Sequence, residues 1–113
     1  MRDSGIEGTI MVIVGYKPKE GKNEKLLKVL KDHVPILRKE GLATDHPTQI
    51  LQTKDGTYLE IFEWVSSKSI ENAHNNKAVL EMWKDFDDAC EYVPLANLEE
   101  SKLMFAGFKP VKI

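Results

Sequence analysis

The stretch YLEIFEWVSSKSIENAHNNKAVLEMWKDFDDACEYVP, residues 58–94, decides how the rest of the chain must fold. Its first part, up to Trp64, is rich in large apolar and aromatic residues, which is typical of a strand. A Ser-rich helix start follows, then His74 and two asparagines, then a second helical run with apolar residues at three- and four-residue spacing. Because an amphipathic helix that returns over a sheet leaves an apolar seam, this stretch predicts the walls of any pocket.

The chain has 113 residues, of which 42% are hydrophobic and 30% charged, and its formal net charge is -2. This length predicts a single domain, residues 1–113, with a polar lead over residues 1–7. The small negative charge disfavours nucleic acid as a partner, because it supplies no basic surface for a phosphate backbone. Neither an apolar signal segment nor a run of about 18 apolar residues is present, so we expect a cytoplasmic protein that does not enter a membrane.

The first predicted strand, residues 8–16, is apolar on both faces. Met11 and Ile13 point to one face, and the alternate residues of the run point to the other. Residues 58–65 repeat this pattern. A strand of this kind must be covered on two sides, which one layer of helices does not achieve.

Residues 22–40 carry apolar side chains at helical spacing and predict an amphipathic helix. Asn23 is a candidate N-cap. Pro35 lies inside the helix, where it removes a backbone hydrogen bond, so we expect a kink or a restart near Val34. His33 falls at the edge of the apolar face, which predicts a half-exposed structural role for its imidazole.

Asp55 and Gly56 lie between two strand-like runs and predict a hairpin. If these two residues form the whole loop, Ile50 lies opposite Ile61. The second run is the strand that ends at Trp64.

Two helical segments, separated by a bend, are predicted after this strand. Ser66 or Ser67 caps the first segment, and Asn75 and Asn76 interrupt it, because asparagine favours caps and turns. The second segment begins directly after them. Its apolar stripe consists of Val79, Met82, Trp83, Phe86, Ala89, Cys90 and Val93.

The tail, residues 102–110, reads as a final strand that Pro110 ends. The order of elements is therefore β-α-β-β-α-β, an α+β fold. This is the ferredoxin-like pattern, in which both helices cover one face of a four-stranded antiparallel sheet. Because the strands are apolar on both sides, the bare face needs a partner, and we expect a homodimer joined through the sheet faces.

The element order, the strand that ends in Glu63-Trp64 and the following SSKSIENAH motif, residues 66–74, resemble the dimeric α+β barrel proteins of the antibiotic biosynthesis monooxygenase type. The resemblance extends over nearly the whole chain, from about Thr9 to Lys109. Family members include small cofactor-independent oxygenases that oxidise phenolic or quinol substrates, and others that bind and degrade haem. The resemblance thus implies a dimeric barrel with a pocket for a small aromatic molecule.

The haem-degrading relatives combine a Trp on the third strand, a His on the second helix and an Asn on the first strand. Trp64 and His74 match two of these residues, but no Asn occurs between Thr9 and Tyr16. Haem is therefore the weaker of the two ligand classes that the resemblance implies.

The candidate site is a stacking pocket for a flat aromatic ligand, with Phe62 and Trp64 as one wall and Trp83 and Phe86 as the other. His74 is the nearby side chain that titrates near neutrality, and Asn75 is placed to orient it. In the alternative interpretation all four aromatic residues are core, because an aromatic stripe at helical spacing is what a packed helix requires.

Three hypotheses follow for the function. The first is a cofactor-independent monooxygenase of a small aromatic or quinol-type molecule, with His74 as its base and Trp64 shaping the pocket. The second is a module that binds haem or another hydrophobic molecule without turnover, and the third is a purely structural dimeric domain. The sequence has no Gly-rich phosphate loop, nucleophile elbow or His-x-x-x-His pair, so it indicates no nucleotide, flavin or metal cofactor.

Overall fold

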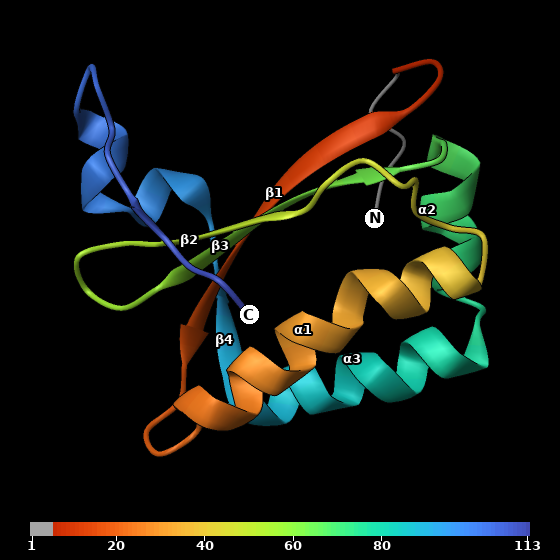
Figure 1. Ribbon diagram of the computed structural model, residues 1–113, viewed down its shortest axis with the longest axis horizontal. Helices are drawn as coiled ribbons and strands as arrows, with labels where there is room; N and C mark the ends of the chain where they lie inside the picture. Colours follow the sequence, from red (N-terminus) through yellow and green to blue (C-terminus); the bar gives the residue numbers. More distant parts are fainter. Residues whose placement is uncertain (1–5) are drawn as a thin grey trace.

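The computed structural model describes residues 6–113, so most of the polar lead predicted over residues 1–7 lies outside the described residues (Figure 1). The strands are β1 (Ile10–Pro18), β2 (Gln49–Gln52), β3 (Tyr58–Trp64), β4 (Cys90–Val93) and β5 (Lys109–Pro110). The helices are α1 (Asn23–Lys39), α2 (Ser67–Ala73) and α3 (Lys77–Ala89). Two 3-10 turns, η1 (Leu95–Asn97) and η2 (Glu99–Lys102), connect β4 to β5. The chain therefore has an α+β fold.

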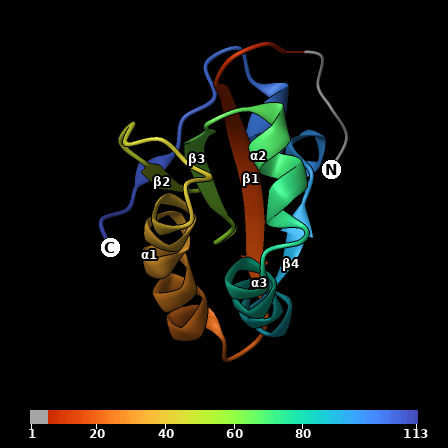
Figure 2. The same cartoon turned by 90° about the vertical axis from the view of Figure 1, so that its right-hand side faces the viewer.

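The strands form one antiparallel sheet in the order β4-β1-β3-β2-β5. The two long strands, β1 and β3, lie side by side at its centre, with Ile10 opposite Trp64 and Tyr16 opposite Tyr58. All three helices lie over the same face of this sheet, as the view from the helix side shows (Figure 2). The side chains of β1 and β3 that alternate toward this face form the floor of the core.

The C-terminal third differs from the prediction. Cys90–Val93, predicted as the end of a helical stripe, is strand β4, which pairs with the edge of β1. A Cβ atom on Gly15 would lie 2.5 Å from the Val93 carbonyl oxygen, so this pairing depends on a glycine. The strand predicted over residues 102–110 is confined to Lys109–Pro110. The expected sheet of four strands is thus one of five, and its fourth strand comes earlier in the chain.

Helix α1 runs without interruption through the exposed Pro35, so the restart expected near Val34 is wrong. Asn23 does not cap this helix. Its side-chain oxygen accepts a hydrogen bond of 2.8 Å from the Tyr58 hydroxyl instead, which joins the first turn of α1 to β3.

The hairpin between β2 and β3 is shifted by one residue from the predicted register, so that Ile50 lies opposite Glu60. The cause is a longer loop, closed by a 2.8 Å hydrogen bond from the Thr53 amide to the Thr57 carbonyl. The Asp55 carboxylate accepts hydrogen bonds from the Thr53 hydroxyl and the Thr57 amide inside this loop. These hydrogen bonds hold the pKa of Asp55 below its usual value, and the one from Thr53 has the largest effect.

The two predicted helical segments and their caps are confirmed. Ser66 and Ser69 form a capping box at the start of α2, each side chain accepting a hydrogen bond from the other's backbone amide. Asn76 caps α3 by accepting a hydrogen bond of 3.1 Å from the Val79 amide. The break between the helices therefore has a local cause, because the Asn76 cap begins a new helix shortly after α2 ends at Ala73.

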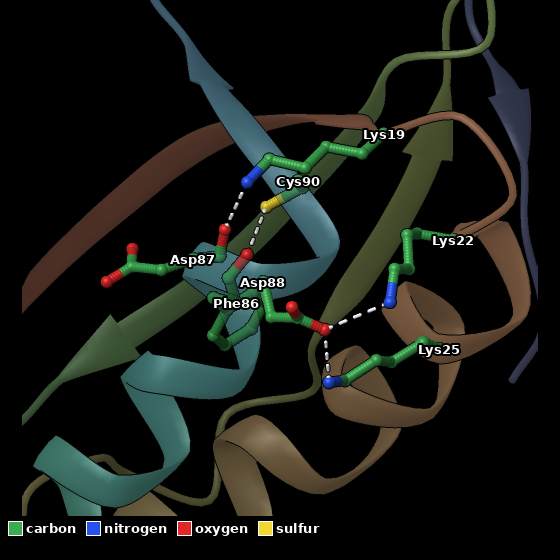
Figure 3. A network of polar contacts seen from close by, with 7 residues as sticks. All are labelled: Lys19, Lys22, Lys25, Phe86, Asp87, Asp88 and Cys90. Carbon is green, nitrogen blue, oxygen red and sulfur yellow. Dashed lines mark hydrogen bonds and ion pairs between the residues drawn. The ribbon is translucent and has the colours of Figure 1, made fainter.

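Polar contacts tie the end of α3 to the start of α1 (Figure 3). The Asp88 carboxylate pairs with the ammonium groups of Lys22 and Lys25, and Lys19 donates a hydrogen bond of 2.6 Å to the Asp87 carbonyl. The Cys90 thiol lies beside them and donates to the Phe86 carbonyl at 3.2 Å. Burial raises the pKa of this thiol to about 11, so it stays protonated at neutral pH.

The core lies between the helices and the sheet. Five members of the predicted stripe are buried in it, namely Val79, Met82, Phe86, Ala89 and Cys90, whereas Trp83 is half-buried at its edge. On the opposite face of the sheet Met11 and Ile13 remain about half exposed, at 48% and 47% of their surface. No helix within residues 6–113 combines the length and the apolar character needed to cross a bilayer.

Phe86→Ala should lower the free energy of unfolding by about 3 to 5 kcal/mol, because it empties a fully enclosed aromatic site. Urea titration followed by circular dichroism measures this loss. Lys84→Ala, an exposed position on the same helix, serves as the control and should change stability by no more than about 0.5 kcal/mol. A loss below about 1 kcal/mol for Phe86→Ala would show that α3 is rotated away from the assigned face.

Candidate functional site

A pocket of about 340 Å³ lies between the helix-covered face of the sheet and the helices. This volume falls in the range of sites that hold small molecules. The sheet contributes Val12, Val14, Tyr16, Phe62, Trp64 and Tyr92 to its lining. The helical layer contributes His33, Ile70, His74, Trp83 and Phe86. The pocket is therefore mostly apolar and aromatic, with two imidazoles as its basic groups.

Of the six residues proposed from the sequence, five line this pocket. Phe62 and Trp64 come from β3, Trp83 and Phe86 come from α3, and His74 follows the last residue of α2. Asn75 is not among the lining residues, and its side chain is exposed. The chain turns after His74 to reach the cap of α3, and this turn carries the next side chain away from the pocket.

His74 lies at the mouth of the pocket. Its side chain is exposed to solvent and also lines the cavity. Its ring meets the Trp83 indole in an edge-on contact, with 5.1 Å between the ring centroids. Because α2 ends at Ala73, the imidazole projects from a helix end and not from the middle of a continuous helical surface.

The deep end of the pocket contains a polar cluster that the sequence did not lead us to expect. His33, predicted to be half-exposed, has only 4% of its surface accessible. Its Nδ1 atom lies 2.8 Å from Oε1 of Glu60, and the Tyr16 hydroxyl donates a hydrogen bond of 2.8 Å to the same oxygen. The Glu60 carboxylate is completely buried. We name these three residues the deep cluster.

The protons of the deep cluster can be assigned from its electrostatics. Burial, together with the Glu60 carboxylate, raises the pKa of Tyr16 well above its usual value, so the hydroxyl keeps its proton and donates it to Glu60. With Glu60 as a carboxylate, which only accepts hydrogen bonds, the 2.8 Å contact assigns the proton to Nδ1 of His33. The imidazole is thereby held in one orientation by a carboxylate, as in many binding and catalytic sites.

Two buried polar atoms at this site have no hydrogen-bond partner within the described part of the chain. They are Nε1 of Trp64 and Oε2 of Glu60. A buried donor or acceptor without a partner costs about 1 to 3 kcal/mol, and proteins seldom leave such groups in a region that serves packing alone. No group of three or more His, Cys, Asp or Glu residues between residues 6 and 113 is arranged to hold a metal ion.

The sequence did contain a signal for the deep cluster. Glu60 alternates with Phe62 and Trp64, which places its charge on the inward face of β3. His33 lies one turn from Leu30 and Leu37 on the buried stripe of α1. A polar residue on each of two apolar faces that pack together predicts that the two residues meet.

No family model matches this chain, and no curated protein matches its sequence. Among solved structures, the fold is similar to that of protein SO0527 from Shewanella oneidensis, with a TM-score of 0.60 and 16% sequence identity. The match covers 78% of this chain and 87% of that protein. At this identity the similarity concerns the fold alone, and it defines an α+β protein built on an antiparallel sheet.

Tyr16 gives the stability of the fold a dependence on alkaline pH. Its pKa is higher in the folded chain than its unfolded value of 10.0, so its contribution is complete below pH 10 and is lost as the pH rises toward the folded pKa. We expect the free energy of unfolding to fall more steeply as the pH rises above 10 in the native chain than in Tyr16→Phe. Urea titrations at each pH measure the two slopes, and parallel slopes would contradict the assignment.

Proposed function

We propose that this chain is a cofactor-independent monooxygenase that acts on a small aromatic molecule of the phenol or quinol type. The observation that carries the proposal is the aromatic-lined pocket with an imidazole at its mouth. Rings on two sides favour a flat aromatic ligand, because stacked and edge-on contacts both add to the burial of apolar area. A ligand held between Trp64 and Trp83 presents its accessible edge to His74.

The reaction needs a base and an electron-rich substrate. His74 takes the hydroxyl proton of the phenol, a step that general-base catalysis typically speeds by about 10² to 10⁴. The resulting anion adds O₂ at a ring carbon and forms a hydroperoxide, which loses water to give the quinone. The substrate supplies all four electrons, one oxygen atom enters the product and the other leaves as water, so no external reductant is required.

The arrangement of the chain supports the family resemblance on which this proposal draws. Strands β4-β1-β3-β2 are ordered as in a ferredoxin-like β-α-β-β-α-β unit, to which β5 adds an edge. The face opposite the helices exposes Met11, Ile13 and Val65. We propose that a second copy of the chain covers this face and forms the dimeric α+β barrel, because apolar side chains clustered on a sheet face favour association.

The function is tested first by a thermal-shift screen of quinols, flavonoids and haem. A ligand at 100 times its dissociation constant stabilises the fold by roughly 2.7 kcal/mol. Oxygen consumption with each phenolic ligand then measures turnover. We expect His74→Ala to lower kcat by about 10² to 10⁴ while the protein keeps its native mass, and Trp64→Phe mainly to weaken binding.

His46→Ala is the matched control, because His46 is an exposed loop histidine outside the pocket, and it should turn over substrate at the native rate. Equal turnover by His74→Ala and the native chain would overturn the catalytic assignment. Stabilisation by haem alone, without oxygen consumption on any phenol, would favour a binding module without turnover.

The dimer is tested by light scattering at micromolar concentration. We expect a mass twice that of the 12.9 kDa chain. Ile13→Lys should shift the protein to the monomer, because it places a charge in the centre of the covered face. Lys28→Ala, at an exposed position on α1 away from this face, should leave the dimer intact. A monomeric mass for the native chain would exclude the barrel.

A further inference from the structure

The proposed reaction uses His74 at the mouth of the pocket and leaves the deep cluster without a role. This cluster is unusual, because it places a carboxylate with no accessible surface beneath an aromatic pocket. Such a group is costly to bury, and apolar side chains of similar size would fill the same space at lower cost. The cluster therefore calls for an explanation beyond packing.

The orientation of His33 supplies this explanation. In the neutral ring that donates from Nδ1 to Glu60, the remaining nitrogen, Nε2, is the acceptor. Nε2 makes no hydrogen bond with any residue from 6 to 113. Nε1 of Trp64 and Oε2 of Glu60 have almost no accessible surface, whereas Nε2 of His33 keeps some. His33 is buried and lines the pocket, so the surface that Nε2 exposes belongs to the pocket.

The neighbours of His33 restrict what this nitrogen can bind. Its ring is in edge-on contact with Phe62 and Phe86, with centroid distances of 5.2 and 4.9 Å. These two aromatic side chains leave the imidazole as the one basic group at the deep end of the described pocket. An acceptor set among aromatic rings suits an aromatic ligand that carries a single donor at its inner edge.

We infer that His33 is the recognition residue of the pocket: its Nε2 accepts a hydrogen bond from the hydroxyl group of an aromatic ligand that enters hydroxyl first, while Glu60 and Tyr16 hold the ring in place. The inference rests on the proposed function for the aromatic character of the ligand, and it adds the residue that distinguishes a hydroxylated aromatic from its unhydroxylated analogue. On a quinol-type substrate with a hydroxyl group at each end, His33 and His74 then have separate roles: His33 recognises the inner hydroxyl at the deep end, and His74 takes the proton of the outer hydroxyl at the mouth.

The test compares 2-naphthol with 2-methoxynaphthalene, which has the same ring system but no hydroxyl proton to donate. Calorimetric titration of the native chain should show that 2-naphthol binds about tenfold more tightly, as expected for one hydrogen bond. In His33→Asn the NH₂ group of the shorter side chain can donate to Glu60 in place of Nδ1. It offers no acceptor at the position of Nε2. This variant should bind the two probes equally.

His46→Asn, the same change at the exposed loop histidine, is the control and should keep the tenfold preference. A preference for 2-naphthol that survives in His33→Asn would overturn the inference, and so would equal binding of the probes, or no binding of 2-naphthol, by the native chain.

Nitrogen-15 spectra of the native protein provide a second measurement if His33→Asn does not fold. The free protein should show a protonated Nδ1 on His33, and 2-naphthol should shift its Nε2 resonance by more than 2-methoxynaphthalene does. Equal shifts with both probes would overturn the inference.

The two proposals fail in distinguishable ways. A preference for 2-naphthol that depends on His33, without oxygen consumption on any phenol, rejects the monooxygenase and retains the recognition site. Turnover that is unaffected in His33→Asn, together with equal binding of the two probes by the native chain, rejects the recognition site and retains the monooxygenase.

Discussion

The burial of Glu60 is the constraint on which the arrangement of the helices and the central strands depends. A carboxylate without accessible surface is tolerable only where donors reach it, and here one donor comes from β1 and the other from α1. The hydrogen bond between His33 and Glu60 fixes the position of α1 over the centre of the sheet, because a shift of the helix by one turn would remove His33 from its partner. The aromatic residues around the cluster then pack in the space that this position leaves.

The sequence predicted the first two-thirds of the fold well, and the reasons are local. Alternation in β1 and β3, the apolar spacing of α1 and α3, and the caps at Ser66 and Asn76 each act over a few neighbouring residues. The C-terminal third depends on long-range pairing. Cys90–Val93 continues a helical apolar spacing, yet the free edge of β1 offers it a full set of backbone hydrogen bonds, and tertiary pairing overrides the local pattern.

The candidate site likewise has a part that the sequence predicted and a part that it did not. The aromatic walls and His74 follow from strand alternation and helical spacing, which place their side chains toward a shared seam. Glu60 and His33 could have been paired by the same reasoning, but an isolated polar residue on an apolar face is easily assigned to an edge. The register of the β2–β3 hairpin was missed because the Asp55 side chain organises a loop longer than two residues, an interaction that the Asp-Gly signal does not reveal.

The brevity of α2 has a consequence for how the pocket opens. A helix of seven residues is far below the length of about 12 to 15 at which a helix is even marginally stable alone, so α2 depends on its capping box and on two buried side chains, Ile70 and Ala73. Segments held by so few contacts open locally at a free energy well below that of global unfolding. Since His74 stands at the end of this segment, fraying of α2 widens the mouth while β1 and β3 stay in register. Local opening of α2 would therefore enlarge the pocket of the helical layer without any rearrangement of the sheet.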